Sequence, residues 1–152
     1  MSLESVKAYL ALKAPDIDII HHEVTTATVQ DAAIAHGCEP GQIAKTLSVR
    51  VGDAVVLVVA RGDARLDNKK AKAALGGKPR MLGAEEVEAL TGHPVGGVTP
   101  FGLATALPVY CDISLRSYQE VIPAGGSRNS SLRIAPERLA ELTAAQWVDV
   151  CE

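Results

Sequence analysis

The most restrictive feature of the chain is a pair of apolar, β-branched segments joined by a turn, TLSVRVGDAVVLVVA, at residues 46–60. Gly52 and Asp53 separate the two segments, and a glycine-containing dipeptide in this place is typical of a tight hairpin turn. The two strands of a hairpin are antiparallel neighbours. The segment therefore disfavours a doubly wound parallel sheet and predicts a mixed sheet or a partly closed barrel, with helices outside it.

The remaining segments predict helices and strands that do not alternate strictly along the chain, as in an α+β fold. From apolar spacing, capping residues and terminal glycines, we expect helices at 2–13, 28–35, 67–75, 84–91 and 136–142. Ser2 is the expected N-cap of the first. We expect further strands at 17–24, 80–82, 107–112, 120–124, 131–134 and 146–150. With no repeat or linker in 152 residues, the chain predicts a single domain over residues 1–152.

Cysteine usage and hydropathy predict the compartment. Cys38, Cys111 and Cys151 are widely spaced and odd in number, which argues against a disulfide framework and for buried thiols in a reducing compartment. The N-terminus lacks the pattern of a signal peptide. The longest unbroken apolar run, residues 54–60, is far shorter than a membrane span. We therefore expect a cytoplasmic protein that does not enter a membrane.

The charge of the chain is unevenly distributed. The formal net charge of −3 excludes a generally basic nucleic-acid binder. Residues 61–80 nevertheless contain two acidic and seven basic residues, the latter being Arg61, Arg65, Lys69, Lys70, Lys72, Lys78 and Arg80. Such a window is either the solvated face of a helix or a positive surface that steers a polyanion to one side of the protein.

Common metal and nucleophile motifs are absent from the sequence. The four histidines, His21, His22, His36 and His93, show no HxxxH spacing, and no cysteine stands at a ligand interval from them. There is no GxSxG motif, and nothing marks a histidine partner for Cys111. We expect no metal, no cofactor and no covalent intermediate, and a packing role for His21 and His22.

The glycine- and proline-rich segment HPVGGVTPFG, residues 93–102, is the strongest candidate for a functional loop. It matches neither GxxxxGK[ST] nor GxGxxG, so it is not a standard phosphate-binding loop. One interpretation is a tight turn between strands. The other is that Gly96 and Gly97 let a ligand approach main-chain N–H groups, which then bind a carbonyl oxygen or an oxyanion. Similarly, Lys45 is either solvated at the start of a strand or a point charge for a phosphate.

Four segments together resemble a known family. They are AKTLSVRVGDAVVLVVARGDARLDNKKAKAALG, LTGHPVGGVTPFG, LPVYCD and AGGSRNSSLRI, in this order. In sequence and spacing they are similar to the YbaK and prolyl-tRNA synthetase editing-domain family of aminoacyl-tRNA deacylases. The similarity covers about residues 20 to 150 and includes no synthetase body. It therefore points to the free-standing, trans-acting members of the family.

The resemblance implies an α/β fold, with a largely antiparallel, curved, barrel-like sheet and surrounding helices. It implies hydrolysis of the ester that links a wrong amino acid to the terminal adenosine of a tRNA, usually the tRNA for proline. Lys45 matches the family's lysine that holds the 3′-terminal nucleotide, and Gly96, Gly97 and Pro100 match the loop that contacts the aminoacyl carbonyl. Gly125 stands where some relatives carry a histidine that shapes specificity, which argues against the alanine-clearing subclass.

On this basis we expect three groups of site residues. The catalytic group is Lys45, Gly96, Gly97 and Pro100. The group expected to contact the substrate is Thr46, Val98, Thr99, Gly102, Asp112 and Gly125. The group expected to contact tRNA is Arg61, Arg65, Lys69 and Lys70. The expected partners are the acceptor end of an aminoacyl-tRNA and prolyl-tRNA synthetase.

The expected mechanism needs no strong protein base, because the ester is activated and a neighbouring ribose hydroxyl can position water. The expected substrate carries a small amino acid, with cysteine placed before serine, threonine and alanine. Two alternatives remain open at this point. One is a non-catalytic module that binds RNA or a synthetase, and the other is a protein that binds the phosphate of a free nucleotide.

Overall fold

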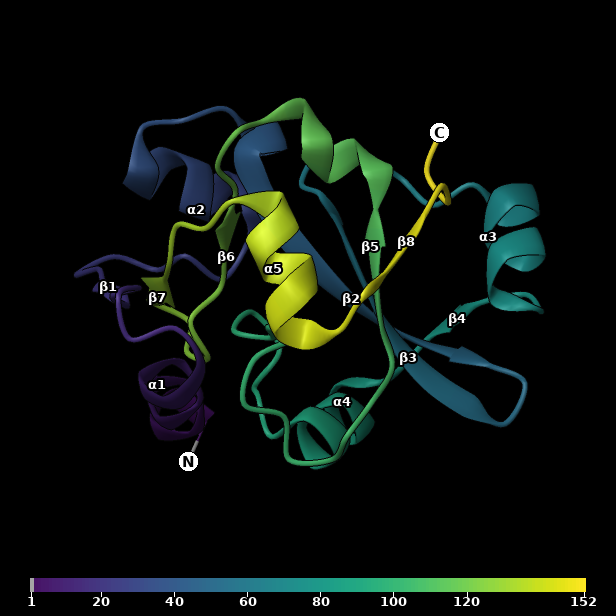
Figure 1. The fold of residues 1–152 in the computed structure, drawn as a ribbon, viewed down its shortest axis with the longest axis horizontal. Coiled ribbons are helices and arrows are strands. Elements are labelled where there is room, and N and C mark those ends of the chain that lie inside the picture. Colours follow the sequence, from purple (N-terminus) through teal and green to yellow (C-terminus); the bar gives the residue numbers. More distant parts are fainter. Residues whose placement is uncertain (1) are drawn as a thin grey trace.

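The computed structural model describes residues 2–152, and its central feature is the expected hairpin (Figure 1). Strands β2 (Ile43–Val51) and β3 (Ala54–Arg61) pair antiparallel from Ala44 and Arg61 to the turn. The turn contains Gly52 with φ of 61°, a left-handed conformation that glycine adopts without strain. The hairpin is confirmed, although β2 begins at residue 43 rather than at the expected residue 46.

The hairpin is the centre of a mixed sheet with the strand order β4–β2–β3–β5–β8. The outer strands are β4 (Arg80–Met81), β5 (Val109–Asp112) and β8 (Gln146–Val148). A further strand, β6 (Ile122–Pro123), pairs parallel with the start of β2. The mixed sheet is therefore confirmed. The expected barrel-like closure is not: within residues 2–152 no pairing joins β8 to β4 or β6, so the sheet is open.

The outer edge of β2 is paired at both ends and open in its middle. Ile43 and Ala44 pair with β6, whereas Val49 and Arg50 pair with β4. The carbonyl of Ser48 accepts a hydrogen bond from the N–H of Leu82 on this side (3.1 Å). Because alternate residues of a strand direct their main-chain groups to the same side, those of Thr46 also face this opening.

The helices lie outside the sheet. They are α1 (Ser2–Lys13), α2 (Val29–His36), α3 (Asn68–Leu75), α4 (Ala84–Thr91) and α5 (Pro136–Thr143), with short 3-10 turns at Pro40–Gln42 and Ile113–Ser117. Two of the expected N-caps are confirmed: Thr28 accepts from the N–H of Asp31, and Asp67 accepts from the N–H groups of Lys69 and Lys70.

Two local expectations at the N-terminal end need correction. Ser2 lies inside α1, and its hydroxyl contacts the side chain of His93 and the carbonyl of Gly126. The strand expected over residues 17–24 is limited to β1 (Ile20–His21), because only these two residues pair with the antiparallel strand β7 (Ser130–Ser131). The alternation of apolar and polar residues therefore extends further than the pairing does.

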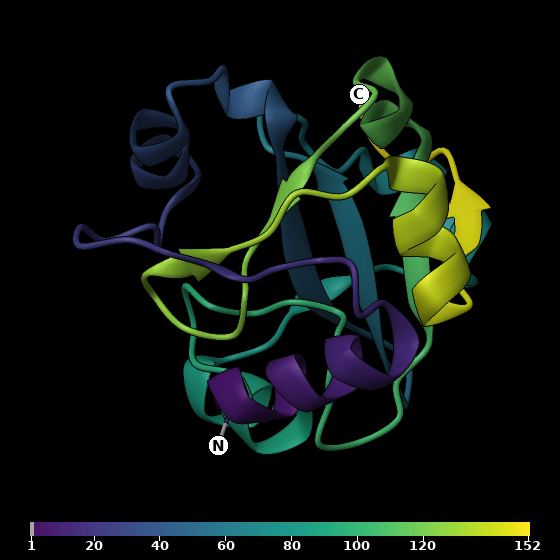
Figure 2. The same ribbon diagram turned by 60° about the vertical axis from the view of Figure 1, so that its left-hand side comes forward.

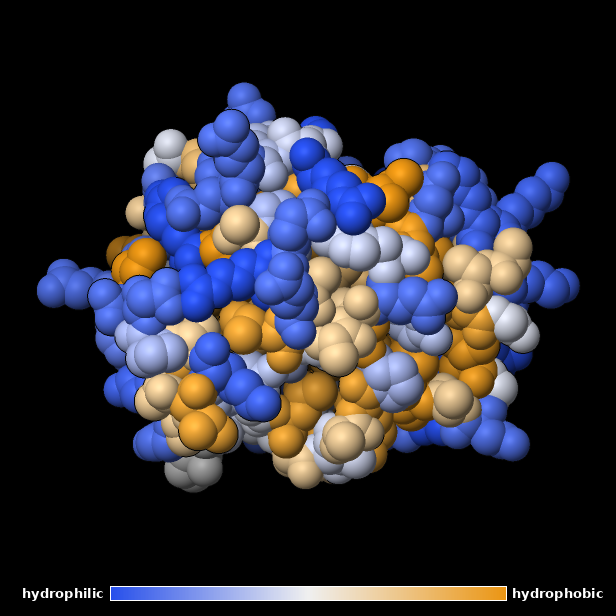
Figure 3. Space-filling model, viewed as in Figure 1, coloured by the Kyte–Doolittle hydropathy of each residue, from blue (hydrophilic) through white to orange (hydrophobic). Residues whose placement is uncertain are grey.

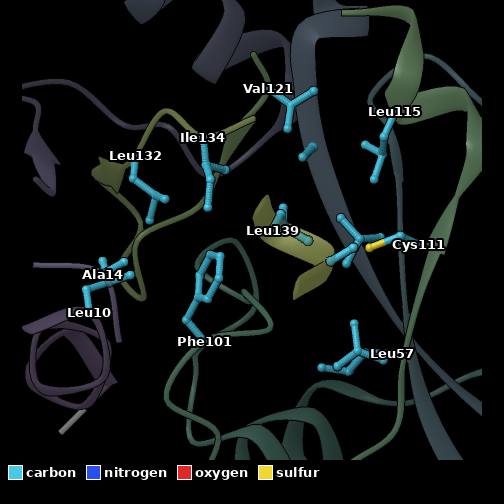
Figure 4. Close-up of a cluster of buried hydrophobic side chains, with 14 of the residues drawn as sticks. Leu10, Ala14, Leu57, Phe101, Cys111, Leu115, Val121, Leu132, Ile134 and Leu139 are labelled. Atoms are coloured by element: carbon cyan, nitrogen blue, oxygen red, sulfur yellow. The ribbon is translucent and has the colours of Figure 1, made fainter. Parts of the chain in front are cut away.

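Two hydrophobic clusters cover the two faces of the hairpin. Alternate residues of β3 divide between them, with Leu57 and Val59 on one face and Val58 and Ala60 on the other. The first cluster joins α1 and α5 to the sheet, and Phe101 lies among its side chains (Figure 4). The second packs α3 and the C-terminal segment against the opposite face. Among residues 2–152 no helix has the length and apolar character needed to cross a bilayer.

Candidate functional site

A cavity of about 230 Å³ lies at the open middle of β2. Its walls come from the start of α2, from β2, from β4 and α4, from the loop after α4, and from β6 and β7. Figure 2 shows α2, β6, β7 and this loop grouped around the free edge of the sheet. The volume lies below the roughly 300–1,000 Å³ of pockets that enclose a whole drug-sized ligand. It therefore suits one small group rather than an entire nucleotide.

The loop at residues 93–102 is clamped at both ends by buried side chains. Phe101 is fully buried, and its ring lies 5.9 Å from that of Tyr9 in α1. His93 is also fully buried, and its Nε2 lies 2.8 Å from the carbonyl oxygen of Phe101. Burial lowers the pKa of His93, so the neutral ring donates this hydrogen bond through Nε2. The loop is therefore anchored to the core of the domain at both of its ends.

The glycines of the loop are required by close packing within the protein. Gly96 has φ of 95°, and a Cβ there would lie 2.9 Å from the Cβ of Ala27. A Cβ on Gly97 would lie 2.9 Å from the main chain of Ser127. The N–H of Gly97 donates to the carbonyl of Pro94 (2.9 Å), which corrects the expectation that this amide faces a ligand. Gly96 and Val98 line the cavity, whereas Gly97 and Pro100 do not.

Lys45 lies in the cavity wall on β2, but its side chain leaves the strand on the face opposite to Thr46, where its ammonium group donates a hydrogen bond to the carbonyl of Ala64. Partial burial lowers the pKa of Lys45, an effect that the nearby Asp63 carboxylate opposes. Asp63 is itself paired with Arg61 (2.6 Å), and within residues 2–152 Lys45 forms no ion pair. It is thus a half-buried cation with a neutral partner, which favours interaction with an anion.

Two hydroxyl groups of β2 are buried in the cavity wall without a hydrogen-bond partner in residues 2–152. They are Oγ1 of Thr46 and Oγ of Ser48, which lie on the same face of the strand. Leaving a buried polar group unpaired costs about 1–3 kcal/mol. A ligand with a polar group in the cavity would recover part of this energy. Thr99 also has an unpaired buried hydroxyl, but it does not line the cavity.

Besides Thr99, three residues that we expected to contact the substrate lie outside the cavity wall. Asp112 is buried, and its carboxylate accepts hydrogen bonds from the N–H groups of Ser114 (2.9 Å) and Val150 (2.7 Å), so it stabilises the fold. Gly102, with φ of 62°, packs against the main chain of α1. Gly125 donates its N–H to the carbonyl of Ser130 (2.9 Å). None of the three lines the cavity.

The expected tRNA-binding residues surround the start of α3. Arg61 pairs with Asp63, and Lys70 pairs with Asp149 (3.1 Å). Arg65 and Lys69 are exposed and form no ion pair with residues 2–152. Figure 3 shows hydrophilic side chains projecting from this end of the molecule. Because the ammonium group of Lys45 contacts Ala64, next to Arg65, Lys45 connects the cavity with the basic segment.

A polar cluster beside the cavity was not found from the sequence. The Nε2 atoms of His22 and His36 lie 2.9 Å and 2.6 Å from the hydroxyl oxygen of Ser131, which lines the cavity. These residues are far apart in the chain, so no spacing motif could identify them. Within residues 2–152 no group of three or more His, Cys, Asp or Glu side chains is arranged to hold a metal ion.

Comparison with known proteins gives matches over most of the chain. The family described as aminoacyl-tRNA editing domain matches residues 23–142. The uncharacterised protein YwhH of Bacillus subtilis is 46% identical over 154 residues, which cover 100% of this chain and 98% of YwhH. EbsC of Enterococcus faecalis, described as a candidate Cys-tRNA(Pro)/Cys-tRNA(Cys) deacylase, is 35% identical over 81% of this chain and 76% of its own length.

A solved structure gives a similar result. The crystal structure of a candidate trans-editing enzyme for prolyl-tRNA synthetase superposes with a TM-score of 0.91 and 38% sequence identity. The superposition covers 99% of this chain and 97% of that one. The similarity therefore includes the whole mixed sheet and the helices around it.

Proposed function

Because this chain belongs to the family of aminoacyl-tRNA editing domains, we propose that it clears a small amino acid, cysteine first, from the tRNA for proline. The general activity, aminoacyl-tRNA deacylation, is supported by the family match and by both relatives with a described activity. We further propose that residues 1–152 act as one free-standing editing domain, in the cytoplasm where aminoacyl-tRNA is used.

The observation that carries the proposal is the meeting of Lys45, Thr46, Gly96 and Val98 in one cavity wall. These residues come from two distant segments of the chain. They combine an unpaired hydroxyl with the main chain of the loop, and the ammonium group of Lys45 lies on the other face of the same strand. An aminoacyl ester presents matching groups: the phosphate and ribose of the terminal nucleotide, an ester carbonyl and a small side chain.

In the proposed mechanism, the amides of Gly96 and Val98 bind the ester carbonyl, because the amide of Gly97 is occupied by Pro94. Negative charge develops on this oxygen when water attacks, and one such donor is worth about 3 kcal/mol in the transition state. The ammonium group of Lys45 leaves the neutral Ala64 carbonyl and binds the terminal nucleotide. The ribose hydroxyl beside the ester helps to position the attacking water.

The size and lining of the cavity support a small acyl group. Its volume of about 230 Å³ is equivalent to roughly seven or eight water molecules. The hydroxyls of Thr46 and Ser48 favour an acyl group with a polar atom, such as a thiol, a hydroxyl or the α-amine. Since Gly125 offers no side chain for recognition, we propose cysteine, serine or threonine before alanine.

The proposed function is tested with a panel of mischarged tRNAs. Purified protein should release cysteine from tRNA for proline faster than it releases proline from the same tRNA. The measurement is the first-order loss of labelled aminoacyl-tRNA, with the uncatalysed rate subtracted. Binding of tRNA or of prolyl-tRNA synthetase without release of any amino acid would instead identify a non-catalytic module.

We expect the basic segment to contribute to tRNA binding rather than to chemistry. The double variant Arg65→Glu, Lys69→Glu should raise KM about tenfold. It should also lower the slope of log kcat/KM against log salt concentration by the amount expected for the loss of about one to two phosphate contacts. Its kcat should change little. The control is Lys13→Glu, which reverses the charge of an exposed residue at the end of α1. An equal increase in KM for Lys13→Glu would show that net charge alone is responsible.

A further inference from the structure

Ser131 is held between two imidazole rings at the wall of the cavity. The rings of His22 and His36 meet edge to face, with their centres 4.7 Å apart, and both direct Nε2 toward the Ser131 hydroxyl. His22 follows β1, His36 ends α2 and Ser131 lies in β7, so three elements build the cluster (Figure 1). Ser131 is only 3% exposed and lines the cavity.

A neighbouring cation determines the direction of these hydrogen bonds. Nη2 of Arg133 lies 3.5 Å from Nδ1 of His36, and a guanidinium group can only donate. Nδ1 of His36 is therefore the nitrogen with the free lone pair, and Nε2 carries the hydrogen of the neutral ring. Burial, His22 and Arg133 all lower the pKa of His36, which keeps this ring neutral. His36 thus donates to the hydroxyl oxygen of Ser131.

The hydroxyl hydrogen of Ser131 then has His22 as its acceptor. The result is a directed chain of hydrogen bonds from Arg133 through His36 and Ser131 to Nε2 of His22. A hydroxyl oxygen has two lone pairs, and His36 occupies one of them. The second remains available to accept a hydrogen bond from a molecule in the cavity.

We propose that Ser131 is a catalytic residue that receives a proton from the attacking water and passes its own proton to His22. His36 and Arg133 act as positioning residues, because they orient the serine without touching the substrate. The inference rests on the proposed deacylation. It supplies a route for the proton that the ribose hydroxyl alone does not provide.

The proposed step conserves protons and electrons. The water oxygen forms a bond to the ester carbonyl carbon while its proton moves to Ser131 and the serine proton moves to His22. When the bond from this carbon to the ribose oxygen breaks, Ser131 returns a proton to that oxygen and is reprotonated by His22. The products are the free amino acid and the ribose hydroxyl of the tRNA, and the protein is unchanged.

The relay requires a neutral His22, because only an unprotonated ring nitrogen can accept the proton of Ser131.

The decisive experiment is single-turnover deacylation with the mischarged tRNA that the wild type clears fastest. Ser131→Ala and His22→Gln should each lower the rate about 100-fold, the smaller end of the usual range for general base catalysis. His21→Gln is the matched control, because it changes the adjacent, exposed histidine of β1 outside the cluster. Circular dichroism and thermal unfolding establish that each variant is folded.

The outcomes separate the relay from the proposed function. A wild type that clears no mischarged tRNA overturns both. A wild type that deacylates, with Ser131→Ala within threefold of it, overturns the relay alone. If Ser131→Ala does not fold, His22→Gln tests the same proton transfer at a half-buried position. A His22→Gln protein that deacylates at the wild-type rate would equally overturn the relay.

Discussion

Replacing Lys45 with methionine is expected to lower the deacylation rate by about 100- to 1,000-fold while the protein stays folded. Lys45 is a cavity-lining residue of β2, and its half-buried ammonium group, on the face of the strand opposite to Thr46, has a neutral carbonyl as its partner. Such a cation can bind a phosphate or a developing negative charge without first breaking an ion pair. Methionine keeps an unbranched, apolar side chain of similar length, so the change removes the charge and little of the packing.

Two further changes at Lys45 and one control variant help to interpret the result. Lys45→Ala should lose the same activity, and Lys45→Arg should recover only part of it, because a planar guanidinium does not reproduce the contacts of a compact ammonium group. Lys69→Ala, on the exposed surface of α3, should change kcat by less than twofold. If purified Lys45→Met clears mischarged tRNA at the wild-type rate, the lysine has no part in the reaction.

Replacing Phe101 with alanine is expected to reduce the free energy of unfolding by about 3–5 kcal/mol. The ring is fully buried in the cluster that joins α1, α5 and the sheet, so its removal leaves a cavity in the main core. Its carbonyl also accepts the hydrogen bond from His93 that holds the loop. Urea unfolding measures the loss, since the midpoint should decrease without a large change in slope.

The substitution Phe101→Ala should also affect the site, because the loop that Phe101 anchors places Gly96 and Val98 in the cavity wall. Phe101→Leu should lose less stability and retain more activity, in proportion to the volume that it keeps. Leu12→Ala is the control for an apolar deletion, since Leu12 is 81% exposed and should change stability by less than about 0.5 kcal/mol. A Phe101→Ala protein as stable as the wild type would exclude this anchoring role.

Features with local sequence signals were predicted well. The hairpin around Gly52 follows from two β-branched segments and a turn, and the helix starts at Thr28 and Asp67 follow from side chains that cap main-chain N–H groups. Helix ends at Gly37, Gly76 and Gly92 adopt the left-handed conformation that glycine favours. Each of these signals involves residues only a few positions apart.

Features that depend on distant residues were not predicted. The unpaired stretch of β2 exists because β4 and β6 pair only with its two ends, and no pattern within β2 indicates this. The occupied amide of Gly97 and the structural role of Asp112 depend on partners whose positions are set by the tertiary fold. The cluster of His22, His36 and Ser131 joins segments about 100 residues apart, a separation at which spacing carries no information.

The interrupted edge of β2 has a consequence for self-association. A long uncovered strand edge acts as a template on which another polypeptide can add a strand, and this is a common route to aggregation. Here the uncovered part is confined to the region of Lys45 to Leu47 by β4 and β6. It is long enough to admit a single aminoacyl group but too short to template a foreign strand. The two flanking strands thus leave an opening beside the cavity while keeping this edge of the sheet too short to template another strand.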